Sequence, residues 1–107
     1  MTEQEASELT GVHLDMAVAK AMKLENVSVH GGRLWIGGKR PFDPSTHWGD
    51  GGPIVEREGI TVGPNNDGLW WAAKAPVGDE DAIGYVGPTP LVAAMRCYVI
   101  ANLGSEE

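Results

Sequence analysis

The sequence has one cysteine, one phenylalanine and no long uninterrupted apolar run. Because a lone cysteine, Cys97, cannot form a disulfide within the chain, a secreted disulfide scaffold is excluded. No apolar stretch approaches the roughly 18 residues that a membrane-spanning helix needs. The acidic, polar start of the chain is unlike a signal or transit peptide. We therefore expect a soluble protein of a reducing compartment.

Charge is distributed unevenly over the 107 residues, whose formal net charge is −7. Positions 9–105 hold 10 acidic and 8 basic residues, a net charge of −2, and three of those acids form the run 79–81. The length predicts one domain at 9–104, with a flexible acidic tail at 1–8 and a short tail at 105–107. Overall acidity disfavours nucleic acid as a partner, but the nearly neutral body leaves room for an anionic ligand.

Helical patterns lie near both ends of the domain. The first begins at about Thr10 and runs to about Leu24, with apolar residues at helical spacing. The second covers Leu91–Leu103, after Thr89 as N-cap and Pro90 as first helical residue. Because this second helix is almost wholly apolar, we expect it to be buried on most sides.

Two predicted hairpins lie between these helices. The first joins Val27–His30 to Arg33–Ile36 through Gly31-Gly32, a pair that supplies the positive φ of tight turns. The second joins residues 60–62 to 69–73 through turn-rich residues, and residues 83–86 add an edge strand. The element order predicts an α+β fold: a small antiparallel sheet of two hairpins, with an N-terminal and a C-terminal helix packed on it.

The stretch between the hairpins is irregular and polar. Residues 39–52 predict an ordered loop with one helical turn at 45–48. Residues 53–58 predict a short helix that starts with proline and ends at Gly59.

Three longer strings are more specific than any short motif: LTGVHLDMAVAKA at 9–21, PSTHWGDGGPIVEREGI at 44–60 and GPTPLVAAMRCYVIANLG at 87–104. Together they resemble the NinX-like family of small bacteriophage proteins over nearly the whole chain. The resemblance implies a phage or prophage accessory protein that acts in the cytoplasm of the bacterial host, and it brings no established catalytic residues. By analogy with other small phage proteins, it suggests binding, including capture of a nucleotide signal of host immunity.

Tryptophan provides the best indication of a ligand site. Trp48 lies in a loop among small residues and backbone donors, a composition typical of pockets for flat polar ligands such as nucleobases. The alternative is that Trp48 anchors its loop to the core. Trp70 and Trp71 are adjacent in a strand, so they point to opposite faces and only one need be core.

Basic and glycine-rich positions suggest where an anion would bind. Gly37 and Gly38 precede Lys39 and Arg40, offering backbone N–H groups beside two cations, although the spacing is not that of a P-loop. Arg96 on its apolar helix either pairs with Asp15, Asp43 or Glu56, or reaches a pocket and holds a phosphate. The helix start at Thr89 offers further N–H groups, unless capping alone explains the motif. The expected ligand-binding residues are Lys39, Arg40, Phe42, Ser45, Thr46, His47, Trp48, Gly51, Gly52, Trp70, Thr89 and Arg96.

Catalytic and metal sites are weaker interpretations. Asp43, His47 and Asp50 could form an acid–base or metal-binding set, but their spacing matches no metal site, and a turn with solvated side chains explains them equally. Ser45 has no nucleophile-elbow sequence around it. Cys97 in an apolar helix is expected to be a buried, inert thiol.

Three functional hypotheses follow. The first is a non-enzymatic protein, without cofactor, that binds a small nucleotide-like ligand and inhibits host defence. The second is a module that binds a host protein through an exposed apolar or acidic surface. The third is a small hydrolase using Asp43, His47 and Asp50. A homo-oligomer is expected, since so short a chain has room only for a shallow pocket of its own.

Overall fold

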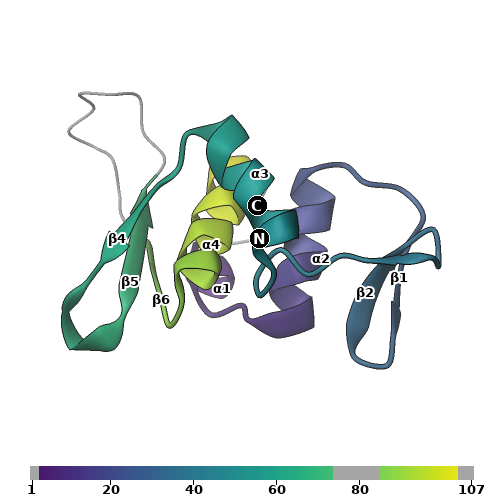
Figure 1. Cartoon of the computed structure of the whole chain (residues 1–107), viewed down its shortest axis with the longest axis horizontal. Coiled ribbons are helices and arrows are strands. Elements are labelled where there is room, and N and C mark those ends of the chain that lie inside the picture. The colour runs from purple at the N-terminus through teal and green to yellow at the C-terminus, as the bar shows by residue number, and fades with distance from the viewer. Residues whose placement is uncertain (1–2, 74–84, 104–107) are drawn as a thin grey trace.

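The computed structural model describes residues 3–73 and 85–103. Their elements lie in three layers, with helices between two small sheets that stand at opposite ends of the molecule (Figure 1). The helices are α1 (Glu3–Ser7), α2 (Gly11–Ala21), α3 (Trp48–Glu58) and α4 (Pro90–Leu103), and a 3-10 turn, η1, covers Asn66–Gly68. Helix α4 is at the centre, where it contacts the other three helices and all strands of one sheet.

Each sheet is a three-stranded antiparallel meander. The first sheet holds β1 (Val27–His30), β2 (Arg33–Ile36) and β3 (Arg40–Pro41) in that order. The second holds β4 (Thr61–Pro64), β5 (Trp70–Ala73) and β6 (Tyr85–Gly87). The expected α+β class and both hairpins are confirmed, but the hairpins belong to two separate sheets rather than to one.

Burial explains the central position of α4. Residues 91–99 of this helix are all buried, as its apolar sequence predicts. Its start is capped as expected, because the Val92 N–H donates to Thr89 Oγ1 at 3.1 Å. Core residues from the rest of the chain belong to the same cluster: Ala6, Leu14, Val18, Leu34, Phe42, Ile54, Ile60 and Ala72.

Several expected boundaries differ in the structure. The segment 1–8 was expected to be a flexible tail, but α1 forms within it and Ala6 is fully buried against the core. Helix α2 ends at Ala21, earlier than Leu24, and α3 begins at Trp48 and continues through Pro53. Pro53, at the sixth position of the helix, has no N–H to donate to the carbonyl four residues earlier, so α3 lacks one internal hydrogen bond there. The acidic run 79–81, residues 83–84 of the expected edge strand, and the tail 105–107 lie outside the described residues.

Candidate functional site

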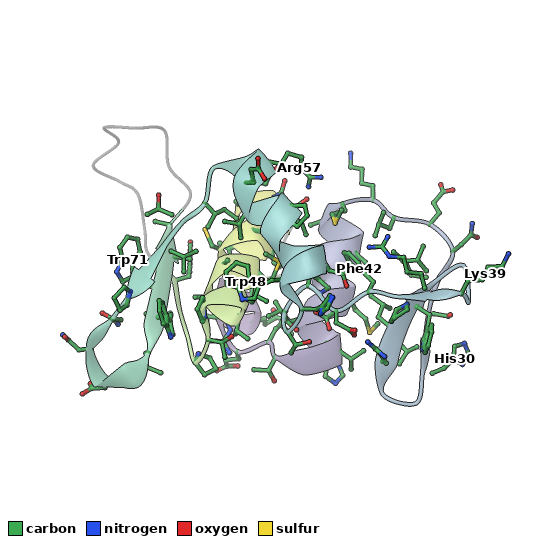
Figure 2. The ribbon with its side chains drawn as sticks, viewed as in Figure 1. His30, Lys39, Phe42, Trp48, Arg57 and Trp71 are labelled. Atoms are coloured by element: carbon green, nitrogen blue, oxygen red, sulfur yellow. The ribbon has the colours of Figure 1, made fainter. Side chains whose placement is uncertain are left out.

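A cavity of about 300 Å³ lies where the start of α3 meets the start of α4. Figure 2 shows Trp48 at this meeting point, near the middle of the molecule. The indole is the largest exposed aromatic group nearby, since Trp48 is 55% exposed. The cavity is lined by Ser45, Thr46, Trp48, Thr89, Pro90, Leu91 and Val92.

Two helix amino termini border the cavity. Trp48 is the first residue of α3 and Leu91 the second of α4, and both residues line the cavity wall. Within the described part of the chain, their backbone N–H groups donate to no protein acceptor. Amino-terminal N–H groups and the helix dipole together create positive potential. The cavity therefore suits a ligand with a negative or hydrogen-bond-accepting group.

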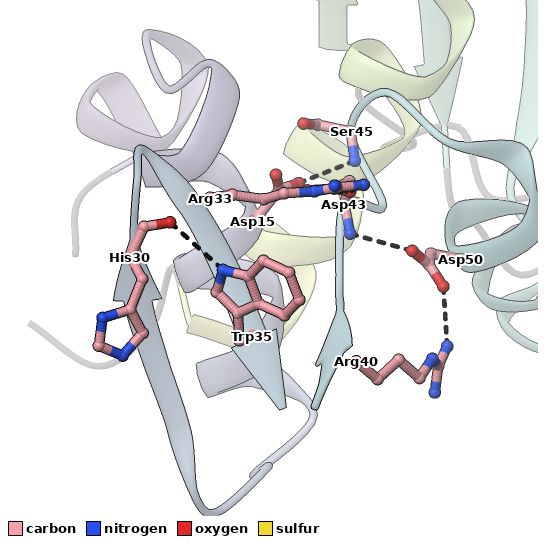
Figure 3. Close-up of polar contacts among 8 residues, drawn as sticks. All are labelled: Asp15, His30, Arg33, Trp35, Arg40, Asp43, Ser45 and Asp50. Carbon is pink, nitrogen blue, oxygen red and sulfur yellow. Dashed lines mark hydrogen bonds and ion pairs between the residues drawn. The ribbon is translucent and has the colours of Figure 1, made fainter. Parts of the chain in front are cut away.

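Carboxylates fix the loop that precedes α3 (Figure 3). The Ser45 N–H donates to Asp15 Oδ1 at 2.9 Å, which ties the loop to α2. The Asp43 N–H donates to Asp50 Oδ2 at 3.0 Å, which ties the same loop to α3. Arg40 from β3 holds the other oxygen of Asp50 at 2.8 Å. These bonds position the cavity wall at both ends of the loop.

Asp15 is a buried acid on the helix face that packs inward. It is 4% exposed, and burial raises the pKa of its carboxyl, although the hydrogen bonds from Ser45 act in the opposite direction. A buried carboxylate is costly unless hydrogen bonded, so its bond to the Ser45 backbone is a structural requirement. The sequence suggested Asp15 as a possible partner of Arg96; its place beside Leu14 and Val18 was the signal for burial.

Glycine allows α3 to cross close to its neighbours. A Cβ at Gly51 would overlap the carbonyl oxygen of Pro44 and lie 2.7 Å from Leu91 Cδ2. Gly51 is therefore a packing residue rather than a ligand contact. A Cβ at Gly52 would lie 3.7 Å from the Trp48 ring, an ordinary contact, so a small side chain would fit at that position.

The structure brings together four of the twelve expected ligand residues, Ser45, Thr46, Trp48 and Thr89. His47 is exposed beside them as the N-cap of α3. Five others do not reach the cavity. Lys39 lies in the turn before β3 and Arg40 in β3, Phe42 is buried in the core, Trp70 lies on β5, and Arg96 donates to backbone oxygens of Leu9 and Val86.

Arg96 follows neither expected interpretation. It is 9% exposed and donates to two backbone oxygens, Leu9 O at 3.0 Å and Val86 O at 2.8 Å. No carboxylate of the described residues forms an ion pair with it, and burial lowers the pKa of its guanidinium. Arg96 joins α4 to the α1–α2 connection and to β6, so its role is structural.

In the set Asp43, His47 and Asp50, both carboxylates are engaged by arginine or backbone groups. Asp43 pairs with Arg33 at 2.6 Å, and Asp50 is bound by Arg40 and by the Asp43 backbone. Residues 3–73 and 85–103 contain no group of three or more histidine, cysteine or acidic side chains placed to hold a metal. Cys97 is buried, as its apolar surroundings predict.

Sequence reasoning missed the apolar wall of the cavity. Pro90, Leu91 and Val92 were assigned to the helix start alone, yet they form one side of the site. The available signal was the repeated pattern of a threonine one or two residues before each helix, Thr46 and Thr89. Nothing in the sequence indicated that the two helix starts meet.

The fold and site define a small α+β protein with a cavity at two helix amino termini. The family model for NinX of bacteriophage P22 matches residues 5–102, and the chain belongs to this phage family. None of the curated proteins matches it. Across the described helices there is none long and apolar enough to cross a membrane.

Proposed function

We propose that this protein is a non-enzymatic phage accessory protein that binds a small nucleotide-like ligand in the cavity between α3 and α4. The observation that carries the proposal is Trp48, 55% exposed at a cavity of about 300 Å³ that two helix amino termini border. An exposed indole has a cost in water that stacking against a planar ligand removes.

Each wall of the cavity suits a different part of such a ligand. The Trp48 ring offers a stacking surface for a base, and stacking of this kind contributes about 1–3 kcal/mol. The N–H groups of Trp48 and Leu91 suit an anionic oxygen at the helix starts. Thr46 and Thr89 supply hydroxyl groups at the same edge.

Charge restricts the ligand further. Neither lysine nor arginine lines the cavity among the described residues, and the expected cations, Lys39, Arg40 and Arg96, lie elsewhere. A polyphosphate would need such cations to offset its charge. We therefore favour a ligand with a base and a single anionic group, such as a nucleoside monophosphate or a cyclic nucleotide.

Membership of a phage family suggests the biological role of this binding. A protein that retains a signalling nucleotide without converting it lowers the free concentration of that nucleotide in the infected bacterium. On this proposal the protein acts in the host cytoplasm, captures a signal of host immunity, and needs no cofactor or catalytic residue.

Thermal unfolding with a panel of nucleoside monophosphates and cyclic mono- and dinucleotides tests the proposal. A bound nucleotide raises the melting temperature further as its concentration increases, roughly with the logarithm of the concentration, because it binds only the folded state. Trp48→Ala should abolish the shift and Trp48→Phe should retain much of it. Leu69→Ala removes another exposed apolar side chain, one that does not line the cavity, and should leave the shift unchanged.

Native mass spectrometry of the protein purified from infected cells supplies the second readout. Retention of an unmodified nucleotide supports sequestration. A panel with no shift, together with an empty protein from infected cells, overturns the proposal; conversion of an added nucleotide shows an enzyme instead.

A further inference from the structure

Strand β1 leaves half of its backbone groups free at the edge of the first sheet. Gly37 N–H donates to Asn26 O at 2.7 Å, which makes Asn26 and Gly37 a hydrogen-bonded pair of the β1–β2 ladder. Antiparallel ladders alternate, so Ser28 and His30 also bond to β2, while Val27 and Val29 direct their N–H and C=O groups outward. The residues of β2 alternate in the same way. Leu34, the partner of Val29, directs its C=O away from β1, where it accepts from the Phe42 N–H at 2.9 Å.

An apolar groove runs beside this open edge. It has a volume of about 400 Å³ and lies between β1 and α2. Met16, Val27 and Val29 are 46%, 38% and 41% exposed there, among the largest exposures of apolar side chains in the described residues. A strand added to β1 would cover these side chains as well as the free backbone groups.

The edge lacks the usual protection. Soluble proteins block open edges with proline, inward-pointing charges or bulges. Strand β1 contains no proline or lysine, and its ladder to β2 is regular through all four residues. Lys20 is the one charged residue of the groove, and it lies on α2. An apolar open edge of this kind is a template for pairing with another strand.

We propose that the partner is β1 of a second copy, paired antiparallel about a two-fold axis at Ser28. Only Val27 and Val29 offer outward groups, so they must form the hydrogen-bonded pairs of the new ladder. In a symmetric pair this places Val27 of each copy opposite Val29 of the other. Ser28 then faces Ser28 across the axis, in a non-hydrogen-bonded pair.

Self-complementarity is the reason for choosing a second copy over a host protein. The register uses every outward backbone group of Val27 and Val29, which gives four hydrogen bonds and joins the two sheets into one of six strands. Because residues two apart share a face, all four valines lie on the side of α2 and fill both grooves. A two-fold symmetric interface uses the same patch on both copies, so the patch must complement itself, and the outer edge of β1 meets this requirement.

Cross-linking tests the register. Ser28→Cys should form a disulfide between copies on mild oxidation, because side chains in a non-hydrogen-bonded pair approach to about 4.5–5.5 Å between Cβ atoms. His30→Cys is the matched control: it is on the same face and more exposed, but the register places it opposite Asn26 of the partner. Cross-linking of Ser28→Cys at least tenfold faster supports the proposal. Equal rates, or a faster His30→Cys, overturn it.

A proline variant tests the backbone pairing itself. Light scattering of the wild-type protein should give twice the chain mass of 11.4 kDa. Val29→Pro removes an N–H that β2 does not use, so the hairpin should remain while each copy loses one bond to the other. The dimer should weaken by at least tenfold. A monomeric wild type, or a folded Val29→Pro protein that dimerises as tightly, overturns the proposal.

Discussion

The two sheets have the same size and topology but join the helices in different ways. The second sheet packs directly on α4, which contacts β4, β5 and β6. Its residues at that contact are small: Ala72 is fully buried, and Gly87 lies against the backbone of α4. The first sheet contributes Leu34 to the core, and two arginine–aspartate pairs join it to the loop before α3 and to α3 itself.

This difference separates a region built for packing from a region open to partners. Close apolar contact makes the second sheet part of the core, where a single added methyl group has no space. Ion pairs at the protein surface contribute little and are screened by salt, so the first sheet is joined more weakly. The open edge of β1 and the groove beside it belong to this more weakly joined sheet.

The largest effect is expected where the second sheet approaches α4. In Gly87→Ala, the new Cβ would lie 2.7 Å from the backbone N of Ala93 and 3.0 Å from Val92 Cγ1, so the strand must move away from the helix. Overpacking against backbone should cost about 3 kcal/mol of the free energy of unfolding, measured by urea denaturation.

Gly52→Ala is the matched control for that substitution. Its new Cβ would lie 3.7 Å from the nearest atom, in the interior of α3, so the variant should be as stable as the wild type or slightly more stable. If Gly87→Ala loses less than about 1 kcal/mol, the second sheet is not tightly packed and the contrast between the sheets fails.

The fold could be predicted from the sequence as far as local signals reach. Gly31-Gly32 fixed one hairpin, and Thr89 with Pro90 fixed the start of α4, because turns and caps depend on neighbouring residues. Whether two hairpins share a sheet depends on contacts distant in the sequence, and no local pattern encodes them. Ala6 shows the same limit, since it is buried where α1 meets α4 and β6, elements distant in the sequence.

The next largest effect is expected at Asp15, the link between α2 and the loop of the cavity. Asp15→Ala leaves the Ser45 N–H buried without its acceptor, which should cost about 2 kcal/mol. Asp15→Asn keeps an oxygen at the same place and should cost less. Equal losses in the two variants, measured by urea denaturation, would show that the Ser45 bond contributes nothing.

The candidate site was predictable in its chemistry but not in its extent. Trp48 and Thr89 were recognisable because an aromatic group among small residues and a capped helix start are local features. Arg96 was misassigned because an arginine on an apolar helix suggests a carboxylate partner, whereas two backbone oxygens bind it here. Backbone acceptors have no sequence signal.

A smaller effect is expected in the pH dependence of stability. Burial raises the pKa of Asp15 above its unfolded value of 3.8, so the folded state holds this proton more tightly. Its contribution is therefore complete below the unfolded pKa and is lost as pH rises through the folded pKa. The stability of the wild type relative to Asp15→Asn should fall over that interval. A difference that stays constant or rises with pH contradicts the assignment.

The smallest effect is expected at the ion pair that joins the first sheet to α3. Arg40 from β3 holds Asp50 at 2.8 Å, but its side chain is 63% exposed, so water and salt screen the attraction. Arg40→Ala should cost about 0.5 kcal/mol at low salt, and the loss should disappear near 1 M NaCl. Urea denaturation at both salt concentrations measures this, with Gly87→Ala as the reference, since a steric cost does not depend on salt. A loss above about 2 kcal/mol that persists in high salt would show that Arg40 orders the cavity loop through Asp50, and the first sheet would then be as firmly joined as the second.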